Sequence, residues 1–169
     1  MKNFNLLQVV PSLNSGGVEQ GTLDLAKGLV EKGYKSFVAS NGGKLVLKLE
    51  KYHSKHFTLP LNSKNIFTIF LNIRRLKKII NQNNINIVHV RSRAPAWTVS
   101  YCKSKNVKTV STYHNIYGHE NFIKKKYNQG LARSDKIIAI SKYVKDSIVK
   151  LYNINPNRIT VIHRGIDTN

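Results

Sequence analysis

Acidic side chains are scarce in this sequence: 8 Asp and Glu stand against 28 Lys and Arg, giving a formal net charge of +20. Such an excess attracts anionic partners, for example nucleic acid, phospholipid headgroups or phosphorylated small molecules. The basic residues are mostly lysines dispersed among many Asn and Ile, so a general compositional bias explains the charge equally well. The few carboxylates form no evident pair of the kind that glycoside hydrolases use.

Cysteine and long apolar runs are also nearly absent. Cys102 is the only cysteine, which excludes a disulfide framework and a thiolate zinc site and fits a reducing, cytoplasmic setting. No stretch of about 18 apolar residues occurs, and the first apolar run is too short for a signal peptide. The patterns G-x-S-x-G, H-E-x-x-H and Walker A are missing. His114 and His119 lack further ligands, so we expect no metal.

Strand and helix patterns alternate along the 169 residues, a length of about one domain. Short apolar runs predict strands at about residues 6–10, 35–40, 56–59, 86–90, 107–112, 136–140 and 159–162. Helical spacing predicts helices at about 18–33, 45–52, 66–83, 95–105, 120–133 and 142–152. This order predicts an α/β fold: a Rossmann-like, doubly wound and mostly parallel sheet of about seven strands with helices on both faces.

The predicted helix over 66–83 has two contrasting faces. Arg74, Arg75 and Lys78 fall on one side, which is either a solvated surface or a surface that lies on an acidic membrane. The other side is an apolar stripe that we expect to face the core: Ile66, Ile69, Phe70, Ile73, Leu76 and Ile80.

Polar residues follow the carboxyl ends of four predicted strands, which meet at one edge of a parallel sheet. Glycines let backbone N–H groups approach a ligand, a helix N-terminus favours an anion, and guanidinium groups bind phosphates or carboxylates. We therefore expect a phosphorylated or sugar-like ligand. Tight turns, structural ion pairs and a hydrogen-bonded loop histidine are the alternatives. The residues are Gly16-Gly17, Arg91-Ser92-Arg93, Tyr113-His114-Asn115 and Ser141, of which Ser141 can also cap the next helix.

Four motifs resemble the N-terminal half of family-4 glycosyltransferases with the GT-B fold. They are Gly16-Gly17-Val18-Glu19, Tyr113-His114, Ile138-Ala139-Ile140-Ser141 and Arg164-Gly165-Ile166-Asp167. The run from Arg91 to Trp97, together with Arg164, looks most like the branch of lipopolysaccharide core sugar transferases. The resemblance covers essentially the whole chain.

The resemblance implies retaining transfer of a sugar from a nucleotide-diphosphate sugar to a glycolipid or lipopolysaccharide core acceptor, without a metal or other cofactor. The loop of Gly16 and Gly17 would approach the donor phosphates, and His114 matches the histidine that contacts the transferred sugar. Arg91 and Arg93 would bind acidic groups of the acceptor. Many relatives have Gly where this chain has Asn115, whose side chain narrows the pocket or adds a contact. The other expected substrate-binding residues are Glu19, Ser92, Tyr113, Tyr117 and Ser141.

The family's second domain, which carries a Glu-x7-Glu motif and most of the donor site, is not in this sequence. We expect residues 1–162 to form the N-terminal domain and 163–169 to begin the interdomain linker, so that this chain alone is inactive. Alternatively, it is a non-catalytic partner subunit, and a separate chain supplies the donor domain. A basic nucleic-acid-binding module is disfavoured, because no nucleic-acid motif is present. We expect a cytoplasmic protein, peripheral on the inner face of an anionic membrane.

Overall fold

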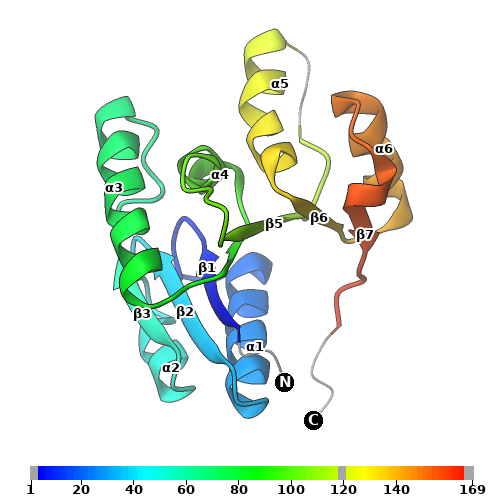
Figure 1. The fold of residues 1–169 in the computed structure, drawn as a ribbon. Coiled ribbons are helices and arrows are strands. Elements are labelled where there is room, and N and C mark those ends of the chain that lie inside the picture. The colour runs from blue at the N-terminus through cyan, green and yellow to red at the C-terminus, as the bar shows by residue number, and fades with distance from the viewer. Residues whose placement is uncertain (1–3, 118–120, 166–169) are drawn as a thin grey trace.

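A computed structural model describes residues 4–117 and 121–165, in which one seven-stranded sheet forms the centre of the fold (Figure 1). The strand order is β3-β2-β1-β4-β5-β6-β7, and every neighbouring pair is parallel. The doubly wound parallel α/β fold is therefore confirmed. The strands are β1 Asn5–Val9, β2 Lys35–Ser40, β3 Lys55–Thr58, β4 Ile87–Val90, β5 Lys108–Tyr113, β6 Lys136–Ala139 and β7 Ile159–Val161.

Helices cover both faces of the sheet (Figure 1). The α-helices are α1 Gly17–Glu31, α2 Val46–Lys51, α3 Ile66–Gln82, α4 Arg93–Ser100, α5 Phe122–Asn128 and α6 Lys142–Tyr152. Two 3-10 turns are η1 Gln129–Arg133 and η2 Pro156–Arg158. None of these helices is long and apolar enough to cross a membrane within the part of the chain that the structure describes.

Two apolar cores lie on opposite faces of the sheet. The larger core joins residues such as Val88, Tyr113 and Ile137 to α3, α4, η1 and α6. The smaller core packs α1 and α2 against β2, for example through Leu23 and Leu49. Because side chains alternate along a strand, His89 of β4 and Thr112 of β5 face the α1 side, away from the larger core.

Three expectations about helices need correction. The apolar stripe of α3 is not buried throughout: Ile66 and Phe70 are exposed, whereas Leu76 and Ile80 are buried. Figure 1 shows why, since the first turns of α3 extend beyond the strands. Helix α4 ends at Ser100, because the following residues turn into an isolated antiparallel bridge.

The helix expected over 120–133 is divided into α5 and the 3-10 turn η1. Residue 120 lies outside the described residues. Gly130 in η1 approaches α4 closely, since a Cβ there would lie 3.0 Å from Trp97 Nε1. The tight turn and its glycine allow this close packing of η1 on α4.

Candidate functional site

The polar residues expected at one edge of the sheet do not form a single site: Arg91 and His114 line one pocket, Ser92 and Arg93 line another, and the others line neither. The first, which we call the α1 pocket, has a volume of about 360 Å³ and lies between α1 and the strands β4 to β6. Its polar lining includes Asp24 of α1, His89 and Arg91 of β4 and its extension, Thr112 and His114 of β5 and its extension, and His163 and Arg164 after β7.

The α1 pocket adjoins the first turn of α1, where glycines permit close contacts. Gly16, at φ +137°, precedes the helix and provides no side-chain cap. Arg164 donates a hydrogen bond from Nη2 to the Gly17 carbonyl oxygen. A Cβ at Gly17 would lie 2.5 Å from Arg164 Nη1, and one at Gly16 would lie 2.7 Å from Glu19 Oε2. The helix start is thus flanked by a guanidinium and a carboxylate, and a side chain at either glycine would displace one of these two groups.

Arg91 is buried and held by the fold. Its Nη1 donates to Gln8 Oε1 at 3.2 Å and to the Gly21 carbonyl oxygen at 3.0 Å. Its Nε has no hydrogen-bond partner among the described residues. Burial, and then the charge of Arg164, lower the pKa of Arg91 to about 10. The group remains charged at neutral pH, so Arg91 gives the α1 pocket a fixed positive charge.

His114 is the least satisfied polar group of the α1 pocket. Both ring nitrogens are buried and have no hydrogen-bond partner among the described residues. Burial, followed by the charges of Arg91 and Arg164, lowers the pKa of His114 to about 4. The imidazole is therefore neutral at pH 7, with one donor and one acceptor nitrogen. Because an unpaired buried polar group is unfavourable, His114 is suited to a ligand that both donates and accepts, such as a sugar hydroxyl.

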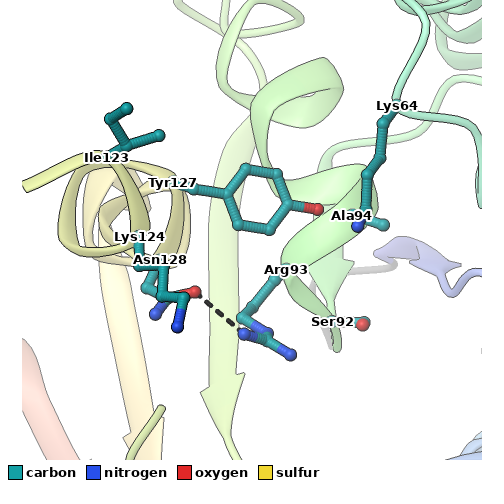
Figure 2. A pocket seen from close by; sticks show the side chains of 8 residues that line it. All are labelled: Lys64, Ser92, Arg93, Ala94, Ile123, Lys124, Tyr127 and Asn128. Carbon is teal, nitrogen blue, oxygen red and sulfur yellow. Dashed lines mark hydrogen bonds between the residues drawn. The ribbon is translucent and has the colours of Figure 1, made fainter. Parts of the chain in front are cut away.

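The second pocket, the Arg93 pocket, has a volume of about 590 Å³ and is shown in Figure 2. Arg93, at the start of α4, donates from Nη1 to Asn128 Oδ1 at 3.0 Å, and its guanidinium lies 4.2 Å from the centroid of the Tyr117 ring. Lys64 Nζ lies 6.0 Å from the centroid of Tyr127. The pocket combines cations, an aromatic ring and an apolar side chain: its lining is Lys64, Ser92, Arg93, Ala94, Ile123, Lys124, Tyr127 and Asn128.

Some expected site residues line neither pocket. Tyr113 is fully buried in the larger core, with its hydroxyl 3.4 Å from the Asn128 carbonyl oxygen, because it faces the opposite side of β5 from Thr112. Asn115 is exposed and its Oδ1 accepts from the backbone N–H of Ile116. Ser141 caps α6 by accepting from the Val144 N–H at 3.2 Å. The ring of Tyr117 packs against the guanidinium of Arg93.

Sequence reasoning missed several residues that the structure brings into the pockets. His89 shares a hydrogen bond of 2.7 Å with Thr112 Oγ1, and burial is the main cause that lowers the pKa of His89 to about 3. The available signal was a polar residue inside an apolar strand, two positions before Arg91. Lys64 and Asn128 come from distant segments and had no local signal.

Two further expectations concern ion pairs and metal. The ion pairs found among the described residues are Lys27–Glu31 and Lys103–Asp135. Neither Arg91 nor Arg93 takes part in one of these ion pairs. No group of three potential metal ligands lies together in residues 4–117 and 121–165. His119, Ile166 and Asp167 fall outside these ranges.

A parallel Rossmann-like sheet with ligand-sized pockets at its strand ends is the half-molecule architecture of GT-B glycosyltransferases. The chain belongs to Glycosyltransferase Family 4, whose family model matches residues 15–169.

Several proteins of similar sequence or fold are glycosyltransferases, and solved UDP-N-acetylglucosamine 2-epimerases share the fold as well. The crystal structure of a glycosyltransferase from Rickettsia africae is 40% identical, with a TM-score of 0.85 over 99% of this chain and 44% of that one. The lipopolysaccharide outer core galactosyltransferase WaaB shares the fold at 15% identity, with a TM-score of 0.72 over 98% of this chain and 47% of that one. The GPI3 subunit of a yeast (Saccharomyces cerevisiae) phosphatidylinositol N-acetylglucosaminyltransferase is 23% identical over 89% of this chain and 36% of its own length. The chain thus spans less than half of each of these proteins.

Proposed function

We propose that residues 1–162 are the acceptor-binding N-terminal domain of a retaining glycosyltransferase. The reaction moves a sugar from a nucleotide-diphosphate sugar to a lipid-linked or lipopolysaccharide core acceptor, without a metal or other cofactor. Family membership supports sugar transfer. The observation that carries the assignment of a site is the neutral, unpartnered imidazole of His114 in a pocket with two arginines.

In this proposal the α1 pocket receives the transferred sugar and faces the donor phosphates. His114 hydrogen-bonds a sugar hydroxyl, which satisfies its buried nitrogens. The first turn of α1, beside Glu19, presents backbone N–H groups at its positive end, and the charges of Arg91 and Arg164 add to this field. Such fixed positive charge stabilises the diphosphate leaving group as its bond to the sugar breaks.

The Arg93 pocket receives the acceptor. The guanidinium of Arg93 and the ammonium of Lys64 attract a phosphate or carboxylate, and the Tyr127 ring offers an apolar face on which a sugar can stack (Figure 2). Its position beside the α1 pocket, on the other side of the β4–α4 junction, would bring an acceptor hydroxyl toward the transferred sugar.

The proposal requires a donor domain from outside these residues. It is supplied by the remainder of a longer chain or by a separate polypeptide, and the yeast relative is itself named as a subunit. We expect residues 1–169 by themselves to transfer no sugar, because in this proposal most of the donor site belongs to the donor domain.

The test joins this chain to the C-terminal part of the Rickettsia africae glycosyltransferase and follows labelled sugar from UDP-sugars into bacterial glycolipid and lipopolysaccharide acceptors. We expect transfer by the fusion and none by the chain alone. His114→Ala should lower kcat by about 100-fold, as expected for the loss of one polar contact to the transition state. Arg93→Gln should mainly raise KM for the acceptor.

A matched control is His53→Asn, which changes an exposed histidine far from both pockets and should leave transfer unchanged. A folded fusion that transfers no sugar from any donor would contradict the proposal, as would full activity of His114→Ala.

A further inference from the structure

We propose that the α1 pocket selects an acidic sugar, whose carboxylate binds between the guanidinium groups of Arg91 and Arg164. This sugar is the one that the reaction transfers, so the inference rests on the proposed function and names its substrate class. A hexuronic acid is the simplest sugar of that class. Three groups that line the pocket would hold it: the two arginines and the imidazole of His114.

Arg91 has one edge of its guanidinium group available to a ligand. Its Nη1 is occupied, since it donates to Gln8 Oε1 and to the Gly21 carbonyl oxygen. Its Nε is buried without a partner in residues 4–117 and 121–165, and its Nη2 donates no hydrogen bond to a protein group in those ranges. A guanidinium edge with two N–H donors binds both oxygens of a carboxylate in parallel. Because the fold holds Arg91 through Nη1, the Nε–Nη2 edge is already oriented.

Gly21 lets the two guanidinium groups approach the same place on α1. A Cβ at this position would lie 2.8 Å from Arg91 Nη2 and 3.7 Å from Arg164 Nη2. Arg164 is held beside the helix by its hydrogen bond to the Gly17 carbonyl oxygen. Glycine inside a helix is less favourable than alanine, and the space that Gly21 leaves for two cations gives a physical reason for its presence.

The charge of this arginine pair is not neutralised by the surrounding protein. Neither arginine forms an ion pair within the part of the chain that the structure describes. Asp24 lines the same pocket, but its Oδ1 accepts a hydrogen bond of 2.6 Å from Gln20 Nε2. After burial, the charge of Arg164 is the next cause that lowers the pKa of Arg91. Two cations that repel each other in this way are stabilised by an anion bound between them.

The other groups of the pocket favour a sugar acid over a phosphate alone. After burial, the charges of Arg91 and Arg164 lower the pKa of His114, so both guanidinium groups act on its imidazole. The neutral imidazole pairs with a hydroxyl group, whereas the arginines pair with an anion. Ile138 and Ile140 add an apolar wall for the C–H face of a ring. A ring that carries both hydroxyl groups and a carboxylate therefore matches the pocket.

The experiment is an NMR titration of the purified, isotope-labelled chain with glucuronate, its uncharged methyl ester, glucose and inorganic phosphate. We expect glucuronate to bind about tenfold or more tightly than its ester or glucose, because the ester keeps the ring and loses only the charge. Inorganic phosphate should bind more weakly than glucuronate, since it has no ring to contact the apolar wall.

Substitutions of the arginines test whether the pair reads the carboxylate. Arg164 is exposed, so Arg164→Gln should keep the thermal unfolding of the unaltered chain. It should weaken glucuronate binding about tenfold and leave glucose binding unchanged. Arg91→Gln should show the same selective loss. Arg75→Gln, at an exposed position of α3 outside the α1 pocket, is the charge-matched control and should bind as the unaltered chain does.

A glycine pair provides a second test. Gly21→Ala places a Cβ 2.8 Å from Arg91 Nη2 and should weaken glucuronate binding more than about fivefold. Gly28→Ala lies on the same helix, where a Cβ meets nothing within 4 Å, and should leave binding unchanged.

Glucuronic acid 1-phosphate shows which substrate carries the acid. On a transferred sugar, the anomeric phosphate adjoins the first turn of α1, so this probe should bind about tenfold more tightly than glucuronate. An acceptor sugar has no such phosphate. Equal or weaker binding of the probe would therefore assign the carboxylate to the acceptor and overturn the inference.

Other results would also overturn it. They are absence of glucuronate binding, equal binding of glucuronate and its ester or of glucuronate and phosphate, and unchanged glucuronate binding in both arginine variants. The titration needs no donor domain, so its failure leaves the proposed transfer reaction standing. Transfer by the fusion from UDP-glucose, at a kcat/KM equal to or above that for UDP-glucuronic acid, would likewise refute the acidic sugar while supporting the proposed function.

Discussion

Acidification should destabilise this protein through histidines that the fold keeps neutral. His89 is buried, and this burial is the main cause that lowers its pKa to about 3, from 6.5 for an ordinary histidine. The pKa of His114 is lowered to about 4. At pH values between these and 6.5, the unfolded chain binds more protons than the folded one. The free energy of unfolding therefore rises with pH across this window and falls on acidification.

The loss of stability depends on how far the pH falls below 6.5 while the folded histidine stays neutral. Below pH 6.5, each histidine that protonates only on unfolding lowers stability by about 1.4 kcal/mol per pH unit. From pH 7 to pH 5 this amounts to about 2 kcal/mol for His89, whatever its folded pKa, provided that this pKa lies well below 5. The contribution of His114 is smaller, because its side chain is only partly buried and solvent screens it. The free energy of unfolding of a domain is usually about 5–15 kcal/mol, so a loss of about 2 kcal/mol is a measurable fraction of it.

Urea unfolding at pH 7, 6 and 5 measures this directly. His89→Gln keeps an amide within reach of Thr112 Oγ1 but cannot titrate. Its loss of stability between pH 7 and pH 5 should be about 2 kcal/mol smaller than that of the unaltered chain. His163→Gln, at an exposed position, should lose as much as the unaltered chain. Parallel pH profiles for His89→Gln and the unaltered chain would refute the reasoning.

Three other substitutions test particular contacts. Gly17→Ala places a Cβ 2.5 Å from Arg164 Nη1 and should lower sugar transfer by the fusion more than about tenfold, whereas Gly28→Ala meets nothing within 4 Å and should leave transfer unchanged. Ser141→Ala removes the cap of α6 and should lower the free energy of unfolding by about 1 kcal/mol, with recovery in Ser141→Asp, as urea unfolding would show. Burial raises the pKa of Asp135, but hydrogen bonds of 2.7 Å from the β5 strand outweigh it and lower that pKa. Asp135→Asn should therefore destabilise the chain at pH 7 by about 1–2 kcal/mol, and its stability should fall less than that of the unaltered chain as pH drops below 4.

The strand and helix order was predictable from sequence because each element carries a clear period of apolar residues. The spacing of apolar residues shows that a helix has an apolar face, but it does not show whether other parts of the protein pack against that face. Leu76 and Phe70 belong to the same stripe of α3, yet Leu76 is buried in the larger core and Phe70 is exposed. The sequence cannot reveal that α3 starts beyond the strands, since this depends on the length of the loop after β3 and on how α4 packs.

The gathering of the polar residues at one edge of the sheet was predictable from the sequence. Their division between two pockets was not. Parallel topology brings all strand ends to one edge, but the direction of each side chain depends on the residue at which strand geometry stops. Arg91 continues the alternation of β4 and so turns to the α1 face, as His89 does. Ser92, which is still extended, precedes the helix, and α4 begins at Arg93, so Arg93 leaves the strand alternation, turns to the opposite face and contacts Asn128. Two arginines that are two positions apart in the sequence therefore line separate pockets, so that one short turn supplies a cation to each of the two proposed substrate sites.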